Sequence, residues 1–254
     1  NKSIKNFLWD SELEDTKFGN VIMGSECLSS RKSCYFIKET EFLYLLTGDE
    51  YEIIDHPEIK NCNNVLLDQS ESILFITSYN LIGGGSLLIY NVQNGEVSSV
   101  NLDFVPLGIA HYGQNKISIS GSYRDNNDYN KTTGGVIYTY DLRNQKLDQI
   151  ELPTETRKKT IRNCFHDDKK NRTWVCTENG LYCLDSLGKS IASYNSDQSA
   201  PEFKVNAPHF RNIHAVEDKL LACTRFEGLL VIDPETNHII DQIDKSDGLS
   251  SEAA

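Results

Sequence analysis

The chain has 254 residues, with 37 acidic and 25 basic side chains and a formal net charge of −12. A surface of this charge repels a phosphate backbone, so we expect no nucleic-acid partner. An apolar fraction of 39% predicts a globular chain, and no apolar run approaches the roughly 20 residues that a membrane-spanning helix needs. The first six residues show no signal-peptide pattern, and Asn1 in place of Met favours a processed chain or part of a longer one.

In chain order, a unit of about 45 residues recurs five times. Each unit contains four strand-like segments, and turns rich in Gly, Asn or Asp follow the later ones. The clearest apolar segment starts 44 to 49 residues after its predecessor and occupies 43–46, 87–90, 136–139, 181–184 and 229–232. The units span approximately 21–60, 61–104, 105–153, 160–197 and 208–245.

A four-stranded unit of this length is typical of one blade of a β-propeller. We therefore predict an all-β chain of about five consecutive blades, in which the strands at Gly180 and Gly228 are equivalent. A two-sheet sandwich is the alternative, but it predicts turn signals every 8–12 residues or so and no longer period. Propellers have about 4–8 blades, so five units can close a ring alone or belong to a larger, incomplete one.

The fourth unit has a more specific pattern in residues 162–185. An apolar strand and a polar turn precede Trp-Val-Cys-Thr at 174–177, and Gly-Leu-Tyr-Cys-Leu-Asp follows at 180–185. This segment resembles the propeller repeat of two-component regulators, whose pattern is Trp-x-Gly-Thr followed by Gly-Leu-Tyr and Asp. Cys176 stands where that family usually has Gly.

The fifth unit keeps part of the same pattern at 221–229, and Asp-Gly-Leu-Ser-Ser at 247–251 resembles the family's inter-blade segment. The resemblance thus covers mainly residues 162–251. It implies a sensor propeller of the kind attached to membrane histidine kinases, as in hybrid histidine kinases. Such a domain lies in the periplasm or outside the cell and senses a ligand, often a carbohydrate; a cytoplasmic location is the alternative.

Two Arg-Asn pairs repeat with the blade period, Arg162-Asn163 and Arg211-Asn212. Residues one period apart lie at equivalent heights around a propeller axis, so we expect both pairs at one end of the central channel. Their directed hydrogen bonds suit a ligand rich in hydroxyl or carboxylate oxygens. A structural hydrogen bond between neighbouring blades is the alternative.

The loops between second and third strands add further candidate ligand-binding residues, because loops on a rigid scaffold commonly carry binding. These candidates are Tyr123, Arg124, Glu178, Asn179, Arg225 and Phe226. Aromatic rings among polar neighbours suit the face of a sugar, and they equally suit a protein partner. His166 and His214 fall in first strands, which line the channel of a propeller.

No catalytic constellation is visible. There is no Gly-x-Ser-x-Gly elbow, and the seven cysteines show neither a C-x-x-C pair nor zinc-like spacing. The runs 83–85 and 125–130 lack the remaining residues of a phosphate loop and an EF-hand, so we predict turns there. We expect no enzyme in this domain, no cofactor and no metal, and we expect Cys176 and Cys223 to lie at matching places in neighbouring blades and to stay reduced.

The leading interpretation is a ligand-sensing propeller of a two-component signalling protein that binds a small molecule or an oligosaccharide. The signal would pass to other parts of a longer protein, which could include a kinase, or to a second copy in a homodimer. The alternative is a scaffold for protein interactions similar to the WD-repeat propellers. The Gly-His and Trp-Asp signatures of that repeat are absent.

Overall fold

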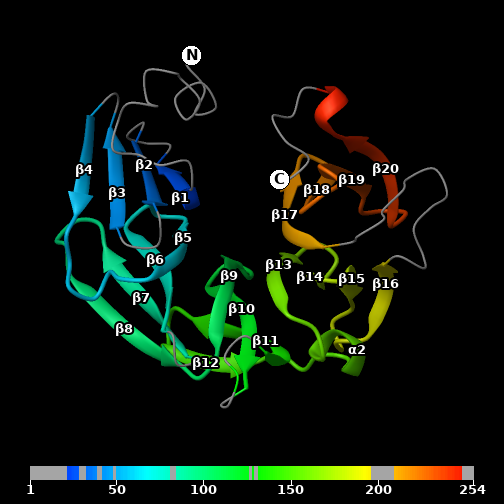
Figure 1. Ribbon diagram of the computed structural model, residues 1–254, viewed down its shortest axis with the longest axis horizontal. Helices are drawn as coiled ribbons and strands as arrows, with labels where there is room; N and C mark the ends of the chain where they lie inside the picture. The colour runs from blue at the N-terminus through cyan, green and yellow to red at the C-terminus, as the bar shows by residue number, and fades with distance from the viewer. Residues whose placement is uncertain are drawn as a thin grey trace. The chain divides into compact units, whose positions relative to one another are not determined.

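The computed structural model describes residues 22–28, 33–38, 42–47, 50–80, 84–125, 128, 131–195 and 209–247. Within these residues the chain forms five four-stranded sheets, each built from strands that are consecutive in the sequence (Figure 1). Each sheet falls within one predicted unit, and Gly180 and Leu229 each begin a third strand. The prediction of consecutive four-stranded blades is therefore confirmed. Of the segment 247–251, the described residues include only Asp247.

The chain divides into two compact units. The first unit contains blade 1 and most of blade 2. Their strands are β1 (Ile22–Leu28), β2 (Ser33–Lys38), β3 (Phe42–Thr47), β4 (Glu50–Ile54), β5 (Cys62–Leu67), β6 (Ile73–Tyr79), β7 (Gly85–Asn91) and β8 (Val97–Leu102). The first strands β1 and β5 lie side by side, and the fully buried Ile37, Leu43, Leu74 and Ile76 share one apolar core between the two blades.

The second unit contains blades 3, 4 and 5. Blade 3 has β9 (Val105–His111), β10 (Lys116–Arg124), β11 (Thr132–Asp141) and β12 (Lys146–Gln149). Blade 4 has β13 (Ile161–Asp167), β14 (Arg172–Thr177), β15 (Gly180–Leu184) and β16 (Ser190–Tyr194). Blade 5 has β17 (Phe210–Val216), β18 (Lys219–Thr224), β19 (Leu229–Asp233) and β20 (His238–Ile243), followed by η2 (Lys245–Asp247). In Figure 1, β13 lies between β9 and β17.

A short helix, α2 (Thr154–Arg157), connects blades 3 and 4. This helix was not expected from the sequence. Pro153 precedes its first turn with φ −55°, a value that its ring fixes and that suits a helix start, and the Pro153 carbonyl accepts the first helical hydrogen bonds. Among the described residues no helix is both long and apolar enough to cross a membrane.

Blade 4 packs against blade 5 through the largest apolar cluster of the second unit. All residues of β14 and β15 are buried, as the inner strands of a blade must be when neighbouring sheets cover both faces. Trp174 of β14 and Phe210 of β17 are fully buried in this cluster, together with Cys176 and Leu230. The close packing of these two blades holds their first strands, and the residues at the ends of those strands, in fixed register.

The first strand of every blade has an irregular pairing near its start. The residue that the ladder skips is Met23, Asn63, Leu107, Arg162 or Arg211 in the five blades. A β-bulge leaves its extra residue outside the ladder and redirects its side chain. Arg162 and Arg211 therefore occupy equivalent bulges in blades 4 and 5.

The cysteines of these blades are the subject of a first prediction. Cys176 pairs with Asn163, and Cys223 pairs with Asn212, so the two thiols hold matching places, as predicted. Both are free in the structure. Burial raises the pKa of the Cys164 thiol from 9.0 to about 11 and that of Cys176 well above its ordinary value.

We expect alkylation of Cys164 and Cys176 by iodoacetamide at pH 8 to be at least about 100-fold slower in the folded protein than in guanidinium chloride. Only the thiolate reacts, and the raised pKa lowers the thiolate fraction at pH 8 by about that factor. Peptide mass mapping of the alkylated protein measures both rates. Fast labelling of the folded form, or a Cys176–Cys223 disulfide, would contradict this account.

Candidate functional site

Arg162 forms an ion pair with a loop residue of its own blade. Its Nη2 atom donates to Oε1 of Glu178 at 2.7 Å. Glu178 belongs to the β14–β15 loop, and the β14 and β15 hairpin brings that loop to the β13 bulge because Ile161 pairs with Thr177. The side chains are 24% exposed for Arg162 and 39% exposed for Glu178, so solvent reaches both partners.

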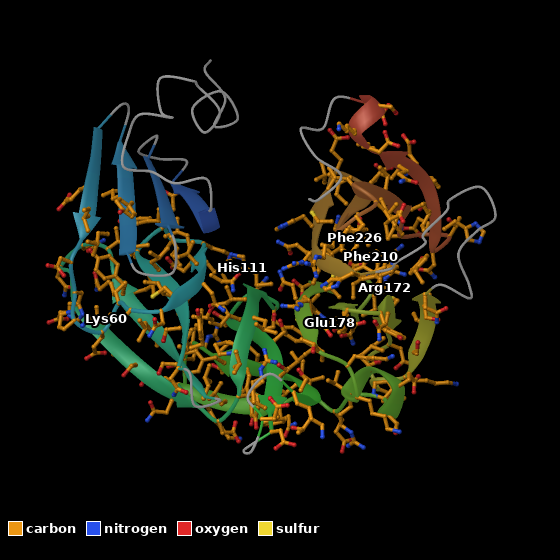
Figure 2. All side chains as sticks on the ribbon, viewed as in Figure 1. Lys60, His111, Arg172, Glu178, Phe210 and Phe226 are labelled. Atoms are coloured by element: carbon orange, nitrogen blue, oxygen red, sulfur yellow. The ribbon has the colours of Figure 1, made fainter. Side chains whose placement is uncertain are left out.

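Four further side chains, from blade 5 and the residue just before it, complete the site: His209, Arg211, Arg225 and Phe226. Arg225 N donates to the carbonyl of His209 at 2.9 Å, and the Arg225 guanidinium lies 5.0 Å from the centre of the Phe226 ring. Burial, together with the positive charges of Arg162 and Arg225, lowers the pKa of Arg211. We call Arg162, Arg211, Arg225, Glu178 and His209 the arginine cluster. Figure 2 labels Glu178 and Phe226, which come from corresponding loops of neighbouring blades.

The pKa of His209 reflects the charges of the arginine cluster. Burial lowers its pKa from 6.5 to about 4, the charges of Arg162, Arg211 and Arg225 act in the same direction, and the charge of Glu178 opposes them. At neutral pH His209 is therefore uncharged. Of the described charged residues that act on His209, three carry guanidinium groups and one carries a carboxylate, so the arginine cluster is positive in a chain whose formal charge is −12.

Two buried nitrogen atoms of the arginine cluster have no hydrogen-bond partner among the described residues. They are Nε of Arg162 and Nε2 of His209. Buried polar atoms in proteins nearly always have a partner, in the protein or in water. The arginine cluster thus has donor capacity that the described part of the chain does not use.

Asn163 and Asn212 have a different role from the arginines that precede them. Nδ2 of Asn163 donates to Oδ1 of Asn212 across the boundary between blades 4 and 5. Each amide oxygen also accepts from the next backbone N–H in its own strand, Cys164 at 2.8 Å and Ile213 at 2.9 Å. This is the inter-blade hydrogen bond that the sequence leaves open as the alternative for these pairs.

The other candidate residues lie apart from these contacts or at their margin. The Tyr123 ring packs edge-on against the Phe104 ring, just before β9, with their centres 6.2 Å apart, and Arg124 Nη1 donates to Thr132 Oγ1 of blade 3 at 3.2 Å. Asn179 follows Glu178 and donates its backbone N–H to Thr177 Oγ1 at 3.3 Å. His166 stacks on Tyr112 at 4.1 Å, toward the opposite end of β13 from Arg162.

His209 is the member of the arginine cluster that the sequence analysis missed. It precedes the Phe-Arg-Asn triplet that starts blade 5, at the place that Thr160 holds in blade 4. The repeat period could have identified the position, but its chemistry differs between the two blades. Among the described residues, no group of three or more His, Cys, Asp or Glu side chains is arranged to hold a metal ion.

The pKa values of the histidines lead to a second prediction. His209 binds its proton near pH 4 in the folded chain and near pH 6.5 in the unfolded chain, so the stability that neutral His209 contributes is complete above pH 6.5 and is lost as the pH falls toward 4. Burial also lowers the pKa values of His166 and His214. We expect urea denaturation to show roughly 1–3 kcal/mol less stability at pH 4.5 than at pH 7, after allowance for solvent screening.

The variant His209→Gln separates the contribution of this residue from those of the other titrating groups. It should reduce the pH dependence between 6.5 and 4, because Gln does not titrate, while His166 and His214 keep theirs. A variant with the full wild-type slope would show that His209 is not desolvated in the arginine cluster.

Comparison with known proteins supports the fold. No protein-family model matches the chain, and no curated protein matches it. The extracellular domain of the putative one component system BT4673 from B. thetaiotaomicron has a TM-score of 0.62 and 18% identity, with 91% of this chain and 29% of that chain covered. The computationally designed Ika8 protein has a TM-score of 0.59 and 10% identity, with 91% of this chain and 63% of that chain covered.

The matched region is thus less than a third of the BT4673 chain. Both likenesses are to propeller structures, and they agree with the five four-stranded sheets observed here. The predicted resemblance to regulator propellers is confirmed at the level of the fold. The chain is all-β with the blades of a β-propeller, and it resembles the extracellular domain of a putative bacterial one-component system.

Proposed function

We propose that this chain is the ligand-binding propeller of a signalling protein and that the arginine cluster is where the ligand binds. The observation that carries the proposal is that, among the described residues, three guanidinium groups share one neighbouring carboxylate, in a chain of net charge −12. Like charges held this close together repel one another, and this repulsion lowers the stability of the fold. A binding role explains why blades 4 and 5 both place Arg at the bulge.

The chemistry of the arginine cluster suits a ligand with many oxygen atoms. A guanidinium group offers five N–H donors in a planar fork, and this geometry matches carboxylates and neighbouring hydroxyl groups. Phe226 beside it is 49% exposed and presents an apolar ring next to these donors. Donors beside an aromatic face fit an oligosaccharide, which has polar edges and a flatter apolar face.

A sensor role is supported by two resemblances. Residues 162–251 resemble the propeller repeat of two-component regulators, and the chain resembles in fold an extracellular domain of a putative one-component system. By the same resemblances the domain acts in the periplasm or outside the cell. Ligand binding would then change contacts with other parts of a longer protein or with a second copy of it.

A thermal-shift screen of neutral and acidic oligosaccharides tests this proposal. The screen uses the whole chain, the variant Arg211→Gln and the control variant Arg143→Gln, whose arginine lies exposed in the β11–β12 turn. We expect a ligand that stabilises the wild type and Arg143→Gln but not Arg211→Gln. Ligands that stabilise all three proteins equally would place the binding site elsewhere.

A further inference from the structure

The ion pair of Arg162 uses only part of its guanidinium fork. Nη2 donates to Glu178, while Nε, which lies on the same edge of the planar group, is buried without a partner among the described residues. A carboxylate bound in the preferred bidentate way takes one hydrogen bond from each of two such nitrogens. Glu178 therefore occupies this edge of the Arg162 guanidinium group but accepts a hydrogen bond from only one of the two nitrogens there.

The remaining charges of the arginine cluster also favour a second carboxylate. Arg225 lies against the Phe226 ring, and Arg211 forms no ion pair among the described residues. Burial and the neighbouring guanidinium groups of Arg162 and Arg225 lower the pKa of Arg211, and the charge of Glu178 opposes them. Neutral hydroxyl groups would leave this repulsion in place, whereas a carboxylate would relieve it.

We propose that the ligand is anionic and that its carboxylate competes with Glu178 for Arg162. Glu178 then acts as a built-in competitor that lowers the affinity for the ligand and makes an anionic ligand necessary. It is borne on the short β14–β15 loop and is 39% exposed, so it can leave Arg162 for solvent without the loss of a core contact. This inference rests on the proposed function, because it assigns the ligand class of the same site.

The two roles open to Glu178 predict opposite results for the variant Glu178→Gln. Gln keeps the size of the side chain and an oxygen that can accept from Arg162, but it removes the negative charge. A competitor that loses its charge lets an anion bind more tightly, by about 3- to 10-fold for charges this close to solvent. A residue that merely positions Arg162 would give equal or weaker binding when its charge is removed.

Calorimetry with three probes tests the inference on the whole chain. The probes are trigalacturonate, its methyl ester, which has the same shape without the charges, and inorganic sulfate. The control variant is Asp148→Asn, which removes one negative charge from an exposed ion pair of the same kind, Lys146–Asp148 at 2.7 Å. We expect trigalacturonate to bind Glu178→Gln about 3- to 10-fold more tightly than it binds the wild type and Asp148→Asn, and we expect the methyl ester to bind no more tightly.

Three results would overturn the inference. None of them by itself overturns the proposed function, which the Arg211-dependent screen tests. Equal or weaker binding of trigalacturonate to Glu178→Gln would make Glu178 a positioning residue. Binding of only the methyl ester or other neutral sugars, with dependence on Arg211, would leave the site correct and the anionic ligand wrong. If neither trigalacturonate nor sulfate binds the wild type or Glu178→Gln, the anionic site is wrong, and the Arg211-dependent screen alone decides the proposed function.

Discussion

Replacing Arg172 with alanine is expected to lower the free energy of unfolding by about 3–5 kcal/mol, because it breaks a buried charge network. The Arg172 side chain is 7% exposed, and its Nε donates to Asp167 at 3.3 Å. Its Nη atoms donate to Asn237 Oδ1 at 3.1 Å and to the Pro234 carbonyl. The guanidinium also lies 5.4 Å from the centre of the Trp174 ring.

These contacts tie the β13–β14 hairpin of blade 4 to the β19–β20 turn of blade 5. Without Arg172, the nearly buried carboxylate of Asp167 loses the guanidinium group that pairs with it, and the carbonyl of Pro234 keeps only the Lys170 ammonium group as a donor. Arg172→Lys should lie between wild type and Arg172→Ala, because a single ammonium group cannot reach all three acceptors. Denaturation in urea at pH 7 measures the changes, with the exposed Arg143→Ala as a control. A loss below about 1 kcal/mol for Arg172→Ala would contradict the structural role, since surface substitutions cost no more than that.

The second large effect is expected in ligand binding. Arg162→Ala and Arg211→Ala should each weaken binding by about 10- to 150-fold, the usual cost of one charged hydrogen bond. Both side chains leave the strand ladder at a bulge, so the fold should survive either change. The double variant should lose less than the product of the two factors, because the arginines share one ligand group. Isothermal calorimetry with the ligand that the screen identifies measures these affinities.

The asparagines that follow the two arginines provide the matched control. Asn212→Ala removes the hydrogen bond to Asn163 and should lower stability by about 1–3 kcal/mol, since it leaves a buried amide unpaired. At a temperature where Asn212→Ala is folded, its ligand affinity should stay close to that of the wild type. Unchanged affinity in both arginine variants, or their failure to fold, would mean that the arginines are structural.

Local patterns made the blades predictable from the sequence. Apolar segments and turn residues act over a few positions, so their 44- to 49-residue spacing directly reflects the four-stranded unit. The spacing also showed that Arg162 and Arg211 are equivalent. It could not show the bulge at each of them, because a bulge depends on how the neighbouring strand pairs.

The different contacts of the Arg and the Asn in each pair could therefore be seen only in the structure. Asn163 faces the next blade and bonds to it, whereas Arg162 turns toward the loop that bears Glu178. Contacts between distant segments were likewise invisible in the sequence. The bond from Arg172 to Asn237 joins residues that are 65 positions apart, and no local pattern marks either partner.

The side-chain NMR signals of the arginines test the central claim most directly. The chain has eight arginines, so a ¹H–¹⁵N spectrum of their Nε–Hε groups resolves each one after assignment by single Arg→Lys variants. Addition of a ligand that passes the screen should shift the signals of Arg162, Arg211 and Arg225 and leave those of Arg124 and Arg143 in place. Shifts confined to Arg124 or Arg143, with the three signals of the arginine cluster unchanged, would contradict the assignment of the ligand site to blades 4 and 5.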